Sequence, residues 1–306
     1  MKKDAALYQA FGFIISSELE LPPLPLAQEQ DAVPDINIAI GPVDINDLSD
    51  PPADEGWYQA SPMQFLMHIP DVAWFMVKHG NSIVIAPENG SDEQSVVLFL
   101  LGSCMGVILH QRNMLVIHGN AIRFGDYCVV FAGPSGIGKS TLAAAFHRLG
   151  HEILADDVCA IDAMGRAVSS YPQLKLWQDA AAKLKISTSG LNKIRYQAKK
   201  FAYPLQRSFQ TALPVAAIYI LSSNNKNEFR TEALEGMNKF IALRDNTYRM
   251  EYLDGLGLKA EHLQQCSKLA AKIHMSRISR PEHGFKLDQL VDFILADLQN
   301  KGIAAA

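Results

Sequence analysis

The sequence predicts an α/β protein with a smaller β-rich unit at its start, and three observations predict this fold class. A strand, a glycine-rich loop, a helix and a second strand follow one another between residues 127 and 161, which is the order of a β–α–β unit. Segments before residue 90 alternate polar and apolar residues with the period of two of a half-buried strand. Apolar residues at helical spacing recur near the end of the chain. We therefore expect a β-rich domain over residues 1–90 and an α/β domain over residues 91–306.

Composition narrows the class of protein. The chain has 306 residues, of which 48% are hydrophobic and 20% charged, as in ordinary globular proteins, so disordered and fibrous classes are excluded. Its formal net charge of −4 gives no overall attraction to nucleic acid or to anionic membranes, and we expect neither as a partner. The four cysteines form no CxxC pair, so we expect reduced thiols and a cytoplasmic protein. The apolar run Val96–Leu109 is too short to span a bilayer.

The first unit should be built mainly from strands. Turn-forming residues such as Gly80-Asn81 separate short apolar or alternating segments. Pro22 and Pro23, which lack a backbone N–H, should end the first of them. The expected strands are Phe11–Leu21, Asp35–Gly41, Gln64–His68, Val72–Lys78 and Ser82–Ala86.

The second unit should begin with a buried helix over Ser91–Arg112, capped by Ser91 or Asp92. The remaining elements follow from apolar runs bounded by turn residues and from helical spacing. The expected strands are Leu115–Ile122, Tyr127–Ala132, Ile153–Ile161 and Val215–Leu221, and the expected helices are 139–149, 233–245, 259–274 and 287–299.

The glycine-rich loop carries the clearest chemistry. Residues 133–140 read GPSGIGKS and fit the phosphate-binding pattern G-x-x-x-x-G-K-[ST]. Glycines let backbone N–H groups approach phosphate oxygens, and the following helix presents its positive end to them. The lysine adds a mobile cation, and the serine hydroxyl can bind Mg²⁺. The predicted ATP-binding residues are Gly133, Pro134, Ser135, Gly136, Ile137, Gly138, Lys139, Ser140 and Thr141.

A pair of acidic residues follows the loop. The short apolar segment 153–155 is followed by Asp156, which comes 17 residues after Lys139, and by Asp157. Mg²⁺ prefers oxygen ligands beside phosphates, so one carboxylate can hold the metal. The other can accept the proton of an attacking hydroxyl. The alternative is a solvated Asp-Asp turn with no chemistry.

The histidines give weaker evidence for a site than the glycine loop and the acidic pair do. His118 ends the strand before the glycine loop, where it is either a structural residue or a member of the site. His110, His147 and His151 lack metal-ligand spacing with acidic or cysteine residues, so we expect no zinc site.

Taken together, His118-Gly119, GPSGIGKST at 133–141 and GHEILADD at 150–157 resemble the catalytic domain of HPr kinase/phosphorylase. The resemblance covers about 45 residues. It implies a core like that of phosphoenolpyruvate carboxykinase, with ATP and Mg²⁺ as cofactors. By this resemblance Lys139 contacts the phosphates, Ser140 and Asp157 hold Mg²⁺, Asp156 is the general base, and His118 lies near the phosphate or the acceptor. The order of the two aspartate roles stays open.

The chain departs from that family after the acidic pair. The glycine-rich signature RGxGxxN is not visible, and residues 171–179 read YPQLKLWQD instead. This segment and FGFIISSELELPPLP at 11–25 resemble a divergent branch that occurs in lasso-peptide biosynthesis and phosphorylates a C-terminal serine of the precursor peptide. The resemblance therefore does not extend HPr as acceptor, or the phosphorylase reaction, to this chain.

Several basic residues remain between the acidic pair and Pro214. Lys175 is either a phosphate contact or a solvated strand lysine, and Trp177 is expected to pack. Lys199, Lys200 and Arg207 form either a solvated basic face or a clamp for the acceptor.

Three functions are compatible with these residues. The first is an ATP-dependent serine kinase acting on a peptide or small protein. The second is a kinase of a small hydroxylated metabolite. The third is a nucleotide-sensing regulator without catalysis, which would not need the Asp156-Asp157 pair. Homo-oligomerisation stays open in all three.

Overall fold

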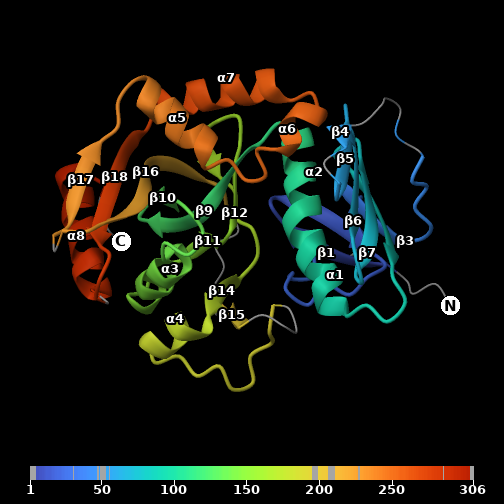
Figure 1. Ribbon diagram of the computed structural model, residues 1–306, viewed down its shortest axis with the longest axis horizontal. Helices are drawn as coiled ribbons and strands as arrows, with labels where there is room; N and C mark the ends of the chain where they lie inside the picture. The colour runs from blue at the N-terminus through green and yellow to red at the C-terminus, as the bar shows by residue number, and fades with distance from the viewer. Residues whose placement is uncertain are drawn as a thin grey trace.

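Two large sheets and one two-stranded sheet make up the β-structure of a mixed α/β fold (Figure 1). The structure is a computed structural model that describes residues 5–29, 31–46, 48, 53–54, 56–194, 199–205, 211–226, 228–284 and 286–303.

The first sheet is formed by residues near the start of the chain. Its order is β1-β2-β3-β8-β7-β6-β5-β4, with parallel pairing only between β2 and β3 and between β3 and β8. Its strands are β1 Ala6–Ala10, β2 Phe13–Ser17, β3 Ile36–Ile40, β4 Ala53–Asp54, β5 Tyr58–Ser61, β6 Gln64–Ile69, β7 Ala73–Lys78 and β8 Ser82–Pro87. The strand expected over Phe11–Leu21 is confirmed only as β2, Phe13–Ser17. Phe11 and Gly12 adopt positive φ and form the turn that joins β2 to β1, a strand that the sequence analysis did not predict.

The expected helix after this sheet is confirmed and is continuous from Glu93 to Gln111. It consists of α1 Glu93–Phe99, the π-helical turn η1 Leu100–Cys104 and α2 Met105–Gln111. Asp92 caps it by accepting from the Ser95 N–H at 2.8 Å. The helix could span a bilayer by length and composition, but 78% of its most apolar window is buried inside the fold.

The second sheet carries the glycine loop. Its order is β10-β9-β12-β13-β16-β18-β17, β11 pairs with β9, and β10 also pairs with β16, so part of the sheet closes on itself. Both β10 and β11 run antiparallel to β9 and therefore parallel to each other. The strands are β9 Leu115–Phe124, β10 Tyr127–Ala132, β11 Ile153–Ala155, β12 Val158–Ile161, β13 Arg166–Ala167, β16 Leu213–Asn224, β17 Arg230–Ala233 and β18 His274–Pro281.

Helices cover both faces of the second sheet (Figure 1). One apolar core packs α3 Lys139–Arg148 and α8 Leu287–Asn300 against it. Another packs α5 Met237–Asp245 and α7 Lys259–Ala270 on the other side. The small sheet pairs β14 Gln173–Trp177 with β15 Lys200–Pro204. The helix α4 Gln178–Lys183 follows β14 directly in the chain.

Three expectations for the second unit need correction. The strand expected over Ile153–Ile161 is interrupted at Asp156 and Asp157, where φ of Asp157 is 74°. The helix expected over 233–245 begins only at Met237, after β17. The helix expected over 259–274 ends at Ala270, and the unexpected strand β18 follows. Polar residues of β18, among them His274 and Arg277, conceal the strand pattern in the sequence.

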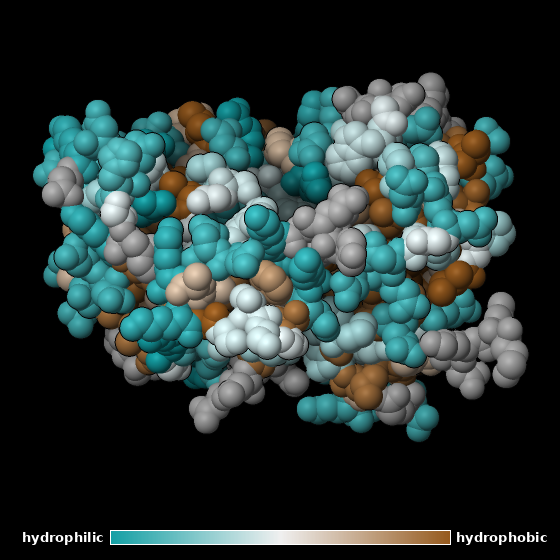
Figure 2. All heavy atoms as spheres, turned by 60° about the horizontal axis from the view of Figure 1, so that its bottom comes forward, coloured by the Kyte–Doolittle hydropathy of each residue, from teal (hydrophilic) through white to brown (hydrophobic). Residues whose placement is uncertain are grey.

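The two units share one apolar core. Residues of the first sheet and of the helix 93–111 pack with Val116, Val158 and Tyr171 and with Tyr252 of α6 Tyr252–Gly255. Figure 1 shows α1 and α2 between the first sheet and the rest of the molecule. The helix that the sequence assigned to the second domain thus packs on the first sheet. The face shown in Figure 2 is mostly hydrophilic, with apolar side chains scattered in small groups.

Candidate functional site

The glycine loop, residues 133–138, connects β10 to α3. Gly133, Gly136 and Gly138 all have positive φ, and Gly138 is the N-cap of α3. A Cβ on Gly133 would lie 2.7 Å from the Leu221 carbonyl oxygen, so no larger residue fits between the loop and β16. Pro134, Ser135 and Gly136 are exposed. The loop therefore presents accessible backbone at the carboxyl ends of the parallel strands β10 and β16.

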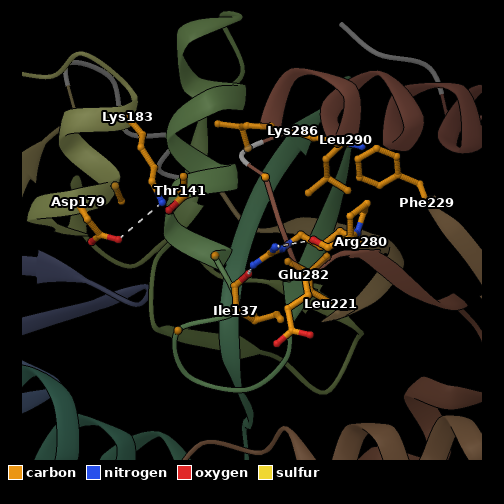
Figure 3. Close-up of a pocket in the computed structure, with 16 residues that line it drawn as sticks. Ile137, Thr141, Asp179, Lys183, Leu221, Phe229, Arg280, Glu282, Lys286 and Leu290 are labelled. Atoms are coloured by element: carbon orange, nitrogen blue, oxygen red, sulfur yellow. Dashed lines mark hydrogen bonds and ion pairs between the residues drawn. The ribbon is translucent and has the colours of Figure 1, made fainter. Parts of the chain in front are cut away.

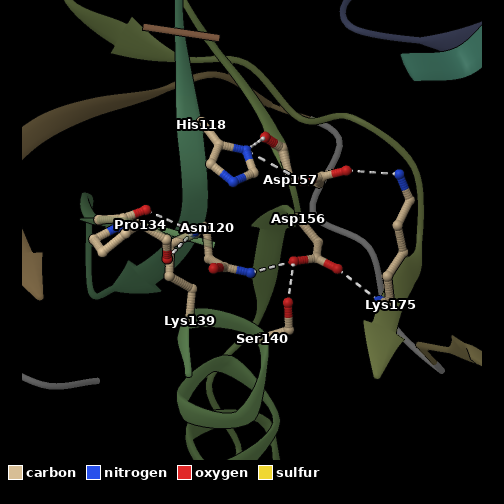
Figure 4. A network of polar contacts seen from close by, with 9 residues as sticks. His118, Asn120, Pro134, Lys139, Ser140, Asp156, Asp157 and Lys175 are labelled. Atoms are coloured by element: carbon tan, nitrogen blue, oxygen red, sulfur yellow. Dashed lines mark hydrogen bonds and ion pairs between the residues drawn. The ribbon is translucent and has the colours of Figure 1, made fainter. Parts of the chain in front are cut away.

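Lys139 points back along the loop. Its Nζ donates to the Gly133 carbonyl at 2.7 Å and to the Pro134 carbonyl at 3.2 Å. Burial lowers the pKa of Lys139, and the charges of Asp157 and Asp156 oppose this shift. The ammonium group is thus held at the end of the loop where Gly133 and Pro134 lie (Figure 4).

Asp156 lies at the end of β11 and is buried. Its Oδ1 accepts from the Ser140 hydroxyl at 3.0 Å and from the Asn120 side-chain amide, and its Oδ2 accepts from the Lys175 N–H at 2.6 Å. Burial and the neighbouring charge of Asp157 raise the pKa of Asp156. Asp156 is therefore joined to the first turn of α3 through Ser140.

Asp157 faces the opposite way from Asp156 (Figure 4). Its Oδ2 lies 2.9 Å from the Lys175 Nζ and its Oδ1 lies 3.2 Å from the His118 Nδ1. Burial alone would raise the pKa of Asp157, but Lys175 and His118 outweigh it and hold this pKa well below its usual range. Its left-handed backbone, rare for a non-glycine residue, turns the two neighbouring carboxylates in different directions.

Lys175 comes from β14 and is only 5% exposed, so of the two alternatives for this residue the solvated strand lysine is wrong. Its backbone holds Asp156 while its ammonium holds Asp157. Burial lowers the pKa of Lys175, but the charge of Asp157 dominates and raises it well above the ordinary lysine range. Lys175 thus fixes both carboxylates.

Asn120 is a member of this network that we did not predict. It is fully buried, its amide N–H donates to Asp156, and its Oδ1 has no hydrogen-bond partner among the described residues. It follows His118 by two positions on β9, so both side chains lie on one face of that strand. That period of two could have identified it in the sequence.

The remaining predicted residues are less closely connected. Ile137 of the loop and Thr141 of α3 line a cavity described below. Trp177 is 48% exposed and lies under the Lys200 ammonium, 5.6 Å from the ring centroid. Arg207 lies outside the described residues. His151 donates from Nδ1 to the Arg123 carbonyl at 3.1 Å and packs on Phe124, away from the carboxylates.

Two cavities open on either side of the glycine loop. The first hollow, about 430 Å³, is lined by Gly136, Ile137, Gly138 and Thr141, by α4, by Leu221 and Phe229, and by the end of β18 and the start of α8 (Figure 3). The second hollow, about 560 Å³, is lined by His118, Gly133, Pro134, Asp157, Ile220 and residues of the segment 245–251. A ligand lying along the loop would therefore reach from one hollow to the other.

The residues present suit Mg²⁺. The Ser140 hydroxyl and an Asp156 carboxylate oxygen lie 3.0 Å apart at the start of α3, and both are hard oxygen donors of the kind Mg²⁺ takes. Mg²⁺ commonly uses one or two protein ligands and completes its shell with phosphate oxygens and water. The resemblance pairs Ser140 with Asp157, whereas in the structure Ser140 bonds to Asp156.

Comparisons with known proteins give little further information. No protein-family profile and no curated protein matches the sequence. A solved structure, the Hpr(Ser) kinase/phosphatase from Coxiella burnetii, is similar over 61% of this chain and 91% of that chain, with 15% sequence identity and a TM-score of 0.33. A likeness this weak does not establish a family, so a function has to be argued from the residues of the site.

Proposed function

We propose that this chain is an ATP- and Mg²⁺-dependent kinase that transfers the γ-phosphate to a hydroxyl group of a peptide or small protein. The observation that carries the proposal is the pair of carboxylates beside the glycine loop. Asp156 is joined to Ser140, whereas Asp157 is paired with Lys175 and lines the second hollow together with His118. A regulator that only binds nucleotide has no need of a second, separately held carboxylate.

The arrangement suggests how the substrates lie. The loop and Lys139 would hold the phosphates, with the nucleoside in the first hollow and the acceptor hydroxyl in the second. The γ-phosphate would then lie between the Lys139 ammonium and Asp157. Phosphoryl transfer depends mainly on positioning and on compensating charge, which a rigid network of this kind provides.

The geometry favours the reverse of the aspartate roles that the resemblance implies. Ser140 and Asp156 would hold Mg²⁺, which when bound neutralises charge on the phosphate oxygens. Asp157 lines the second hollow and would accept the hydrogen bond, and then the proton, of the attacking hydroxyl. Its low pKa keeps it ionised, so its contribution is to orient the hydroxyl and to take the proton late in the transfer.

The acceptor class is a separate part of the proposal. A serine hydroxyl, and the C-terminal serine of a lasso-peptide precursor in particular, follows from the resemblance of short segments. The second hollow, about 560 Å³, has room for a side chain with flanking backbone and equally for a small hydroxylated molecule, so its volume does not choose between them. The metabolite kinase is the alternative if only small acceptors react.

The test is mass spectrometry of the products formed with ATP and Mg²⁺. Candidate peptides, among them precursor peptides encoded beside this chain, and a panel of small hydroxylated metabolites would be offered separately. A product heavier by one phosphate on a serine supports the proposal, and Lys139→Ala should abolish it. Phosphorylation of metabolites alone would favour the metabolite kinase. Nucleotide binding with no phosphorylated product from any acceptor would favour the regulator.

A further inference from the structure

Arg280 stands at the first hollow but belongs to none of the motifs that the sequence suggests. It lies near the end of β18, in register with Ser223 of β16. Because β10, β16 and β18 run parallel, their carboxyl ends meet at the glycine loop. This strand therefore places Arg280 at the loop, although Arg280 lies 143 residues after Ile137 in the sequence.

The guanidinium group touches the loop directly. Its Nη2 donates to the Ile137 carbonyl at 3.2 Å and its Nη1 donates to the Pro281 carbonyl at 3.1 Å (Figure 3). Both acceptors are neutral, and among the described residues no carboxylate forms an ion pair with Arg280. A guanidinium has five N–H donors, so these two contacts leave donors for a ligand in the hollow.

Lys139 and Arg280 bond to different ends of the glycine loop. Lys139 bonds to Gly133 and Pro134, which line the second hollow, whereas Arg280 bonds to Ile137, which lines the first. A nucleotide whose γ-phosphate faces Asp157 must run its other phosphates toward the first hollow. Arg280 would then lie beside the phosphates that stay with the nucleoside after transfer.

We propose that Arg280 is a second phosphate-binding cation, which binds the α- and β-phosphates of the nucleotide from the first hollow. This rests on the proposed function and deepens it by assigning the leaving group a cation of its own. When the bond between the γ-phosphorus and the bridging oxygen breaks and the acceptor oxygen bonds to that phosphorus, the hydroxyl proton passes to Asp157. The β-phosphate gains negative charge at that moment, and Arg280 compensates it.

The experiment measures the affinity of the full chain for ADP and for adenosine at low and high salt. Arg280→Gln should weaken ADP binding about 10- to 100-fold, as expected for loss of a charged hydrogen bond, and leave adenosine binding unchanged. It should also flatten the dependence of ADP affinity on salt, because a charge contact has been removed. Arg280→Lys keeps the charge and should retain that salt dependence. Arg277→Gln, on the same strand but exposed and paired with Glu232, is the matched control and should change ADP binding less than twofold.

Two results would overturn the assignment. If Arg280→Gln weakened the binding of ADP and of adenosine equally, Arg280 would only shape the hollow. If it weakened ADP binding by a factor that does not depend on salt, Arg280 would only support the Ile137 carbonyl. Circular dichroism and thermal unfolding would check that each variant is folded. If the unmodified chain binds ADP and Arg280→Gln binds it equally well, this inference fails alone. If the unmodified chain binds no ADP, the proposed function fails with it.

Discussion

The two hollows beside the glycine loop are supported in different ways. The first is enclosed by neighbours of the loop in the same sheet and by the helices packed on that sheet. The second owes one wall to the segment 245–251, which depends on contacts with the first sheet and with the helix 93–111. The hollow proposed for the nucleotide is thus built from the second unit, whereas the hollow proposed for the acceptor requires both units.

Contacts with the segment 245–251 show how closely the two units fit. The ring of Tyr248 lies against the helix where a Cβ on Gly106 would come within 2.9 Å of it. His110 bonds to the Tyr248 carbonyl at 2.9 Å, and the Tyr58 hydroxyl donates to the Glu251 carbonyl at 3.1 Å. The π-helical turn η1, Leu100–Cys104, lies in the same helix just before Gly106. Such turns often occur near functional sites. A change at this junction should therefore reach the acceptor and spare the nucleotide.

The largest expected effect separates the two sides at the carboxylates. Asp157→Asn should lower the rate of phosphate transfer by about 100- to 10,000-fold, because it removes the group that we propose receives the proton. Affinity for ATP should stay within a few-fold, since Asp156 and Ser140 are untouched. Transfer rate and nucleotide affinity would be measured on the same preparation. Asp245→Asn, exposed in the same hollow, is the control; normal transfer by Asp157→Asn would return the base role to Asp156.

Lys175→Met should give the largest loss of stability. It leaves Asp157 partly buried without its cation, which costs about 2–4 kcal/mol of the free energy of unfolding at pH 7. The pKa of Asp157 is depressed in the folded chain, so its contribution is present above the usual carboxyl pKa and is lost as pH falls through the folded value. The difference between wild type and Lys175→Met should therefore shrink below about pH 4. Urea unfolding at pH 7 and at low pH measures it.

The double variant Lys175→Met with Asp157→Asn is the check on that explanation. It removes both charges and should recover most of the lost stability, because no buried charge is left unpaired. If the double variant is as unstable as the two single losses added together, the pair does not interact as the 2.9 Å contact implies.

Asn120→Leu tests the nucleotide side with a change of similar shape. It removes the amide that holds Asp156, so the Mg²⁺ affinity of the nucleotide complex should fall about 10-fold or more. Titration of Mg²⁺ against ADP binding measures this fall, and ADP affinity in the presence of a chelator serves as the internal control. An unchanged Mg²⁺ titration would show that Asp156 needs no support from β9.

These two sides also differ in how far the sequence predicts them. The glycine loop, Ser140 and the acidic pair follow from a motif within 25 consecutive residues, from Gly133 to Asp157. Lys175 could be identified as a candidate, but its burial and its bonds to both carboxylates depend on pairing between β14 and β15. The segment 245–251 and Arg280 carry no local pattern, because strand pairing and the junction between the units bring them to the site. The sequence pattern therefore identifies candidate residues where neighbours in sequence form the candidate site, and it misses those that the fold brings together.

The smallest expected effect tests the junction itself. Gly255 lies in α6, and a Cβ there would come within 2.6 Å of the Ala60 Cβ and 3.0 Å of the Ala60 carbonyl oxygen. Gly255→Ala should therefore cost about 1–3 kcal/mol of stability by overpacking, although alanine is the better helix former. It should raise KM for the acceptor and leave ADP affinity unchanged, because the first hollow is not built on this contact. Ala60→Gly in the same chain removes one of the two clashing atoms and should restore part of both losses. A change in ADP affinity as large as that in acceptor KM would show that the nucleotide side also depends on the first unit.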